Sequence, residues 1–179
     1  ENNPVYYTTR NINDNIIVLE IQSIDNKLLW KSNHKKGESI IRTIFQLDKS
    51  IQDIQSELIN NDVNTIIEKA IDTYPGLRII NEPLFPTLIS FICSTQMRVT
   101  RIHDMVQSIS ESFGSSINID GMTYYAFPTP EQLSSATESD LKDLKLGYRA
   151  SYVIKTVDMI VNQDTPLELP CNVSDARNY

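Results

Sequence analysis

The spacing of apolar residues changes about a third of the way along this chain. Three short runs near the start are rich in β-branched and aromatic residues, with turn-forming Asn and Asp between them: residues 5–9, 16–22 and 27–31. From Ser50 onward, apolar residues recur at helical spacing instead. The pattern predicts an antiparallel β-meander followed by helices that continue to the end of the chain, which is an α+β fold.

The helical part divides at residues that usually begin or end helices. Residues 51–59 and 66–71 carry the first two helical patterns, with a polar break at 61–64. Further boundaries are Pro86 in the first turn of an apolar helix, Gly114 at the end of the next helix, and residues 127–131 at the start of a short one. We expect a sheet domain over residues 1–62 and a helical domain over residues 63–179.

Composition limits the kinds of protein that this chain can be. With 179 residues and 40% apolar content, it can bury the core of one or two domains. No apolar run reaches the roughly 18 to 20 residues of a membrane span, and no signal-peptide pattern opens the chain. Cys93 lies in an apolar run and Cys171 follows Pro170 in a loop, so we expect reduced thiols and no metal site. The sequence predicts a soluble protein.

The net charge of −7 argues against a protein that coats nucleic acid non-specifically, because such binding depends on cations that displace counterions from phosphates. A local basic patch is still compatible with it. Between Lys27 and Lys49, six Lys or Arg residues face two acidic residues, a local balance of +4. A patch that meets nucleic acid and an ordinary solvated turn both fit this segment.

Tyr148 and Arg149 lie side by side at a predicted hinge between two helices. Residues 139–144 predict a short helix that Gly147 closes, and residues 152–161 predict the next one. Side chains at such a hinge can project away from the core. There a ring can fill a gap in a stack of bases, and a guanidinium fork can meet paired acceptors on a base edge. The alternative is a core tyrosine packed between the two helices.

Three ordered motifs are similar to those of a known family. They are residues 91–96 followed by Arg101-Ile102 and Met105-Val106, residues 124–130, and residues 146–150. Together they resemble the 8-oxoguanine DNA glycosylases. Residues 45–48 and 77–80 also look like the link from that family's sheet domain into its helices, so the resemblance covers nearly the whole chain. It implies a partial TBP-like antiparallel sheet domain followed by a partial helical domain of the helix-hairpin-helix glycosylase type.

The resemblance assigns roles to several side chains. These enzymes extrude the oxidised guanine and leave an orphaned cytosine beside a hole in the stack. Tyr148 matches the wedge residue whose ring occupies that hole. Arg149 and Arg101 match the two arginines that reach the acceptor edge of the cytosine. For Arg101, the alternative is a surface helix residue paired with Asp104.

Two residues between the helices complete the predicted DNA contacts. Gln96 falls where many family members carry an asparagine that touches the cytosine, and a longer amide can still accept from its exocyclic amine. Met97 and Arg98 depart from the asparagines typical of animal members, and Arg98 can meet a phosphate instead. This departure puts the strictness of the cytosine preference in question.

The lysine and aspartate of the family's excision chemistry are not expected among these residues. In the family, a lysine amine attacks the sugar and an aspartate assists, both within a Gly-rich helix-hairpin-helix segment that follows the region matched by residues 174–177. The chain has no Gly-rich hairpin, and Lys155 reads as a solvated helix lysine. It also opens just after the family's Gly-Gln-x-Phe-x-Trp segment. We therefore expect an internal piece of a longer enzyme, inactive by itself.

Three functions remain open at this point. The resemblance implies a base excision repair enzyme with glycosylase and β-elimination lyase activity that removes 8-oxoguanine opposite cytosine. A non-catalytic module that keeps the scaffold and binds DNA or a partner protein is the alternative, and a domain without any DNA role is the third. For the first, we expect double-stranded DNA as partner, no cofactor, metal or membrane, a monomer, and an intracellular location: cytoplasmic in a prokaryote, nuclear in a eukaryote.

Overall fold

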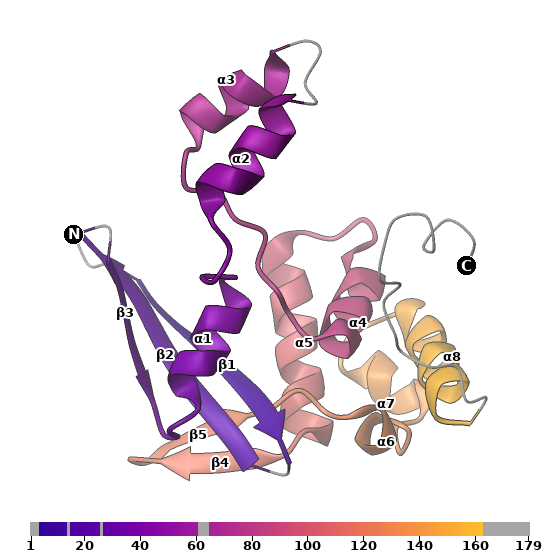
Figure 1. The fold of residues 1–179 in the computed structure, drawn as a ribbon. Coiled ribbons are helices and arrows are strands. Elements are labelled where there is room, and N and C mark those ends of the chain that lie inside the picture. Colours follow the sequence, from indigo (N-terminus) through magenta and orange to yellow (C-terminus); the bar gives the residue numbers. More distant parts are fainter. Residues whose placement is uncertain (1–3, 14, 26, 61–64, 163–179) are drawn as a thin grey trace. The chain divides into compact units, whose positions relative to one another are not determined.

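A computed structural model describes residues 4–13, 15–25, 27–60 and 65–162 (Figure 1). Within these ranges, the backbone clusters into two compact units. One unit holds residues 4–6 and 19–82, and the other holds residues 7–18 and 83–162. The domain boundary drawn from the sequence, between residues 62 and 63, falls inside the first unit and stays a prediction.

The first strands form the predicted antiparallel meander. Strands β1 (Val5–Ile12), β2 (Asn15–Ile24) and β3 (Lys27–Ser32) make a three-stranded sheet in the order β1-β2-β3. In the β2–β3 pair, Leu19 lies opposite Ser32 and Ile24 lies opposite Lys27. Asp25, in the turn between these strands, has a left-handed backbone with φ of 48°, which Asp tolerates better than most residues. The turn thus falls between the second and third strands, where the sequence predicts it.

A helix in the first unit was not predicted from the sequence. Helix α1 (Gly37–Ile44) buries Ile40, Ile41 and Ile44 on one face, although the helical pattern seemed to begin only at Ser50. The helix has only eight residues and follows a basic turn, so its period was too short to stand out. Its first residue lies against β3: a Cβ on Gly37 would come 2.5 Å from the Cβ of Ser32. Only glycine fits this close approach.

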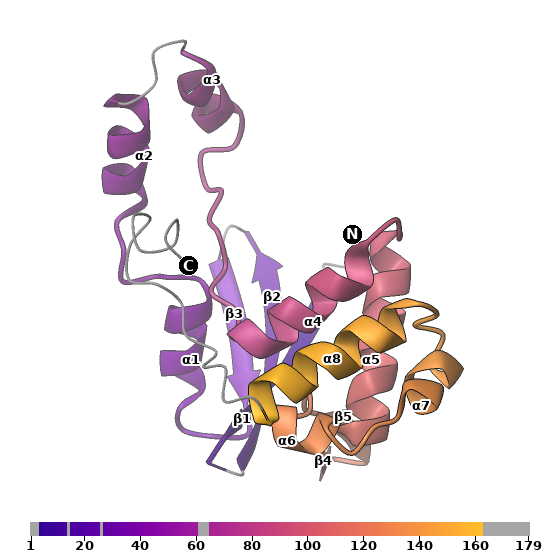
Figure 2. The ribbon, with the colours of Figure 1, turned by 90° about the vertical axis from the view of Figure 1, so that its right-hand side faces the viewer.

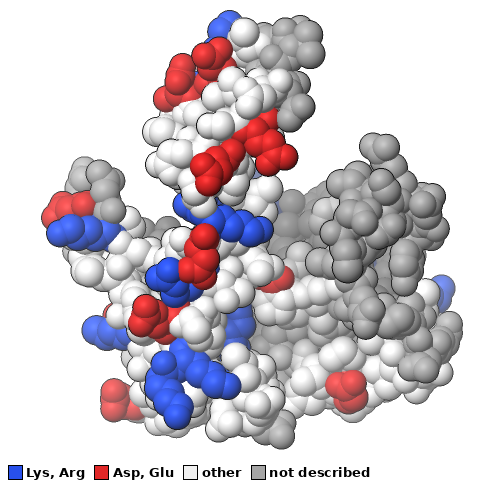
Figure 3. All heavy atoms as spheres, in the orientation of Figure 1, with Lys and Arg blue, Asp and Glu red and all other residues white. Residues whose placement is uncertain are grey.

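Helices α2 (Ile51–Asn60) and α3 (Ile66–Thr73) follow as predicted and complete the first unit. The segment that returns from α3 is tied to the end of α1, because Arg78 Nη1 donates to the carbonyl of Gln46 at 3.0 Å. Acidic side chains gather over α2 and α3, whereas Lys and Arg side chains gather over α1 and its surroundings (Figure 3). Part of that basic group is already paired, since Lys31 contacts Glu20 at 3.4 Å.

The second unit is built around helices α4 (Leu84–Ser94), α5 (Val99–Phe113), α6 (Pro130–Leu133), α7 (Glu138–Asp143) and α8 (Arg149–Val161). Helix α4 packs against both α5 and α8, and α8 also contacts α6 and α7 (Figure 2). Their shared core consists of Phe85, Ile89, Cys93, Met105, Ile109, Leu133, Ala136, Leu141, Leu146, Ala150, Val153 and Val157. Pro86 and Gly114 mark helix ends as predicted. This core is the rigid base from which the site is presented.

The prediction that helices continue to the end of the chain is wrong between α5 and α6. Strands β4 (Ser116–Ile119) and β5 (Met122–Tyr125) form an antiparallel hairpin there. Asp120 and Gly121 make its turn with φ of 51° and 83°, the positive values that a two-residue hairpin turn requires. Tyr125 accepts a hydrogen bond from Thr9 Oγ1 of β1 at 3.0 Å, within the same unit. An Asp-Gly pair is a hairpin signal that the strand pattern, only four residues on each side, was too short to reinforce.

Candidate nucleic-acid interface

The loop between α4 and α5 carries two of the predicted DNA contacts. Helix α4 ends where Thr95 leaves the helical conformation and Gln96 adopts a left-handed backbone with φ of 54°. The amide of Met97 then donates to the carbonyl of Ser94 at 3.1 Å, and Arg98 precedes the first turn of α5 with extended dihedrals. Gln96 and Arg98 are both exposed, so the loop presents them to solvent. Their roles as DNA contacts stay predictions.

The turn between α7 and α8 begins with a helix terminus of the Schellman type. The amide of Leu146 donates to the carbonyl of Leu141 at 3.2 Å, and the amide of Lys145 donates to that of Lys142 at 2.8 Å. Lys145 holds the left-handed position with φ of 66°. The sequence pointed to Gly147 as the closing residue, which is wrong: the helix ends at Asp143, and Gly147 supplies a second left-handed residue at φ of 60° in the turn itself.

Left-handed residues on either side of buried Leu146, Lys145 and Gly147, reverse the chain and place Tyr148 at the N-terminus of α8. Tyr148 is 55% exposed, which excludes the alternative of a core tyrosine. Its ring makes an edge-to-face contact with Tyr152, with centroids 6.3 Å apart and planes at 88°. Tyr152 is equally exposed and lies one helical turn further along α8. The i, i+4 spacing of the two tyrosines is the sequence signal that places Tyr152 beside the site.

Arg149 does not project away from the core, contrary to the expectation from its hinge position. It is the first residue of α8 and only 3% exposed. Its Nη2 donates to the carbonyl of Thr95 and its Nη1 to that of Leu146 at 3.5 Å, while Nε is buried without a hydrogen-bond partner. The guanidinium carbon lies 4.5 Å from the centroid of the Tyr148 ring, which is a cation–π distance. The carbonyl of Thr95, just after α4, and that of Leu146, in the α7–α8 turn, thus hold the cation inside, next to the exposed ring.

The contact of Arg149 with Thr95 joins the two segments that carry the predicted site. The α4–α5 loop and the α7–α8 turn are 54 residues apart in the chain, yet this hydrogen bond brings them together. Cys93 lies in the same region: it is fully buried and is the last residue but one of α4. Burial raises the pKa of its thiol to about 11, although the nearby Arg149 cation acts in the opposite direction. Cys93 is therefore a neutral core residue at physiological pH.

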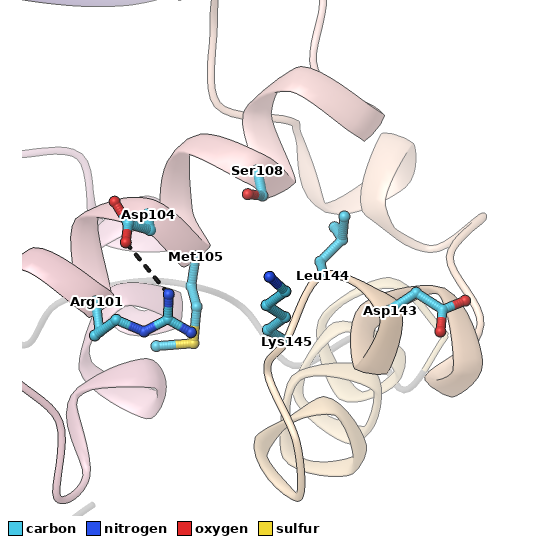
Figure 4. A pocket seen from close by; sticks show the side chains of 7 residues that line it. All are labelled: Arg101, Asp104, Met105, Ser108, Asp143, Leu144 and Lys145. Atoms are coloured by element: carbon cyan, nitrogen blue, oxygen red, sulfur yellow. Dashed lines mark hydrogen bonds and ion pairs between the residues drawn. The ribbon is translucent and has the colours of Figure 1, made fainter.

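Arg101 lies in the first turn of α5 and forms the expected ion pair with Asp104, Nη1 to Oδ2 at 3.4 Å. Both side chains are about half exposed, so the pair contributes little to stability and can be exchanged for other partners. Arg101 also lines a polar pocket of about 230 Å³ between α5 and the end of α7 (Figure 4). The structure therefore keeps Arg101 accessible, whereas it buries Arg149.

Other chemistry is not visible in the described part of the chain. Among residues 4–162 with their gaps, no group of three or more His, Cys, Asp and Glu side chains could hold a metal ion. No helix in the same ranges is long and apolar enough to cross a membrane. Lys155 lies exposed on α8. Residues 174–177, which mark the approach to the family's catalytic segment, lie outside the described residues.

Comparisons with known proteins agree with this architecture. The model of the HhH-GPD superfamily of base excision DNA repair proteins matches residues 89–177, which contain both segments of the site. An N-glycosylase/DNA lyase of Saccharomyces cerevisiae is 47% identical over 89 residues, which are 49% of this chain and 24% of that protein. The corresponding protein of Arabidopsis thaliana is 34% identical over 86 residues, 48% of this chain and 23% of its own length. The chain thus matches about a quarter of these curated relatives.

Solved structures extend the similarity beyond the helical unit. The 8-oxoguanine glycosylase/lyase of Clostridium acetobutylicum, solved with double-stranded DNA containing cytosine opposite 8-oxoguanine, superposes with a TM-score of 0.74 at 30% identity. The match covers 90% of this chain and 57% of that one. Its apo form gives a TM-score of 0.75 at the same identity. By motif, sequence and fold together, the chain belongs to the HhH-GPD superfamily of base excision DNA repair proteins and, within it, to the 8-oxoguanine DNA glycosylase family.

Proposed function

We propose that this chain is the part of an 8-oxoguanine DNA glycosylase and AP lyase that opposes the lesion and inspects the orphaned cytosine. The observation that carries the proposal is the pairing of an exposed ring with a buried guanidinium at the start of α8. Tyr148 is exposed, and Arg149 lies beneath it at a cation–π distance. A surface that both fills a gap in a base stack and recognises the remaining base needs these two groups next to each other.

Tyr148 has the properties of a wedge. Its exposed ring is supported from one side by Tyr152 and from beneath by Arg149, so few rotamers remain open to it. Stacking of a base on an aromatic side chain is worth about 1 to 3 kcal/mol, comparable with the few kcal/mol that unstacking one nucleotide costs. A ring held in place before binding loses little side-chain entropy on insertion. The ring can therefore offset most of the cost of opening the duplex.

Arg149 is suited to read the orphaned base because its Nε–H is unsatisfied. A buried donor without an acceptor costs about 1 to 3 kcal/mol, and that cost is recovered when an acceptor arrives. Cytosine without its guanine offers a ring nitrogen and a carbonyl oxygen as acceptors. A base that presents donors at the same edge would leave the guanidinium unsatisfied. The exchangeable ion pair of Arg101 provides a second cation for the same edge.

The proposed partner is duplex DNA with 8-oxoguanine opposite cytosine. The solved relative from C. acetobutylicum was bound to such DNA, and this chain resembles it at 30% identity over 90% of its length. The net charge of −7 means that the whole surface does not attract DNA, so binding has to depend on local groups. We expect a salt-dependent affinity that is higher for the lesion duplex than for undamaged duplex.

Binding measured by fluorescence anisotropy tests the proposal. The chain should bind the lesion duplex more tightly than the undamaged one, and Tyr148→Ala should remove that difference because the gap in the stack is no longer filled. Tyr152→Ala is the matched control, since it removes an equally exposed tyrosine that supports the wedge without inserting. It should lower the preference only partly. Equal affinity of the unchanged chain for both duplexes, or indifference to Tyr148→Ala, would refute the proposal.

A DNA-binding module without chemistry of its own is the second candidate. The observation in its favour is that all three lysines described in the second unit, at positions 142, 145 and 155, are exposed. A lysine that forms a Schiff base with a sugar is usually desolvated, so that its amine is neutral. Borohydride reduction in the presence of lesion DNA tests whether one of these three lysines carries out the lyase chemistry. We expect no covalent adduct between this chain and the DNA. An adduct at Lys155 would contradict the proposal that the catalytic lysine lies outside the described residues.

A further inference from the structure

We infer that Lys145 holds a backbone phosphate of the bound duplex, in the pocket that it shares with Arg101. The inference rests on the proposed function, since it needs DNA at this surface, and it adds an anchoring contact that the family motifs do not mark. Tyr148 and Arg149 concern the bases. Lys145 lies in the same turn, three residues before the wedge.

The pocket has the lining of an anion site. Arg101, Asp104, Met105 and Ser108 contribute from α5, and Asp143, Leu144 and Lys145 contribute from the end of α7, around a volume of about 230 Å³. Figure 4 shows the Lys145 side chain extending toward α5, with its ammonium group on the side of Arg101 and Ser108. The Asp143 carboxylate is turned away from both cations. Two cations and a hydroxyl group thus share one opening.

The formal charges of the lining residues cancel, but the Asp143 carboxylate points away from the opening, which leaves Asp104 as the acidic group near the two cations. Asp104 is engaged by Arg101 at 3.4 Å, so it is not available to Lys145. Lys142, on the same short helix, is neutralised by Glu138 at 2.7 Å. Lys145, in contrast, makes no ion pair with any residue in the described ranges. A single positive charge therefore remains in a pocket whose one inward carboxylate is already used, which favours an anionic ligand.

The backbone at Lys145 indicates that the side chain is there for a reason other than folding. The residue occupies the left-handed position of the Schellman terminus, at φ of 66°, where glycine or asparagine is the usual choice. A lysine strains the turn, and residues in such conformations cluster at functional sites. Among the described residues, the Lys145 side chain makes no hydrogen bond and no ion pair. A contact with DNA explains why a cation occupies the position.

A phosphate is the anion that this chemistry favours. Lysine is a compact point charge that binds phosphate oxygens without the planar fork needed for a base edge. The Ser108 hydroxyl can donate to a second oxygen. Arg101 can exchange its weak pairing with Asp104 for the same phosphate or for the cytosine beside it. One phosphate contact does not read sequence, so it should add the same affinity to every duplex.

The salt dependence of DNA binding tests this inference, because each phosphate contact adds about 0.9 to the slope of log affinity against log salt. Lys145→Asn removes the charge and keeps a residue that tolerates the left-handed backbone, and Lys145→Gly removes it with no strain at all. Both should lower the slope by about one. Between about 50 and 200 mM salt, the unchanged chain should then lose roughly 3.5-fold more affinity than either variant. Lys142→Asn is the matched control and should leave the slope unchanged.

The outcomes separate this inference from the proposed function. A lower slope in both Lys145 variants, with the preference for lesion over undamaged duplex retained, supports a phosphate contact. If the original chain binds DNA and both Lys145 variants keep its slope of log affinity against log salt, the phosphate contact is overturned and the wedge is left intact. No salt-dependent binding by the unchanged chain would overturn the proposed function, and the phosphate contact with it.

Discussion

Arg149 is buried, yet we expect its replacement by methionine to cost little stability. The structure shows one strong hydrogen bond, from Nη2 to the carbonyl of Thr95, and a second at the limit of 3.5 Å to the carbonyl of Leu146. A hydrogen bond from a charged donor contributes about 1.5 to 3 kcal/mol. The buried Nε–H has no hydrogen-bond partner, which destabilises the folded state by about 1 to 3 kcal/mol. Methionine removes this penalty together with the hydrogen bond.

Neither of the two carbonyls that accept from Arg149 loses its last hydrogen-bond partner in this substitution. Thr95 is exposed, so water can replace the guanidinium at its carbonyl. The carbonyl of Leu146 keeps the hydrogen bond that it accepts from the backbone amide of Arg149 at 3.2 Å. Methionine is also flexible enough to fill the space under the Tyr148 ring. The net change in the free energy of unfolding should therefore lie between about 0 and 2 kcal/mol.

Urea denaturation of the unchanged chain and of Arg149→Met measures this change, provided that the slope against urea is the same for both. Binding to duplexes with an orphaned cytosine is measured on the same samples, and the cytosine preference should be lost. Arg149→Lys is the control: it keeps a charge but not the fork, so it should also lose the preference and destabilise more. A loss above about 3 kcal/mol with the cytosine preference intact would show that Arg149 is a structural residue, and that the reasoning fails.

Three further changes test local features of the second unit. Gly114→Ala should cost about 1 to 3 kcal/mol or more, because the new Cβ would lie 1.9 Å from the carbonyl oxygen of Ala126; a loss within about 0.5 kcal/mol in urea denaturation would contradict this packing. Burial raises the pKa of the Cys93 thiol from 9.0 to about 11, so the neutral thiol stabilises the folded state fully below pH 9. The free energy of unfolding should then fall by roughly 3 kcal/mol as the pH rises from 9 through 11. In Cys93→Ala, denaturation curves measured at alkaline pH should lack this decrease. Thr137→Ala should cost about 1 kcal/mol at neutral pH by removing the cap of α7. The Thr137 backbone amide and hydroxyl hold the pKa of Asp140 below its usual value, so the stabilisation from ionised Asp140 is present above pH 4 and is lost on acidification. If the destabilisation by Thr137→Ala stays constant down to pH 2, the capping geometry is contradicted.

Local sequence signals predicted most of the elements. Turn residues such as Asp25 lie where the strands reverse, and Pro86 and Gly114 lie at helix ends, because their backbone preferences act over only a few residues. Short elements were missed for the corresponding reason. Helix α1 and the hairpin at Asp120 each offer too few apolar residues for a period to be seen, and packing against neighbouring strands makes them stable.

The sequence proposed a candidate site but could not give its geometry. The adjacent Tyr148 and Arg149 pointed to a surface for bases, and the ring is indeed exposed. The burial of Arg149 depends on the carbonyl of Thr95, 54 residues earlier, and no local pattern reports such a contact. The left-handed backbone of Lys145 also depends on how α7 ends, since the sequence offered Gly147 as the more obvious terminus. Long-range acceptors and helix termini are thus what the sequence left open.

The preference for cytosine among the four opposite bases tests the central claim most directly. Affinities are measured for duplexes that carry a stable abasic analogue opposite cytosine, adenine, guanine or thymine, so that the lesion itself plays no part. We predict that the unchanged chain binds the cytosine duplex at least about fivefold more tightly than the others, as expected for about 1 to 3 kcal/mol of discrimination from a bidentate contact. Arg149→Met should reduce all four affinities to a common value. Equal affinities for the four duplexes with the unchanged chain would contradict the claim that this surface reads the orphaned base.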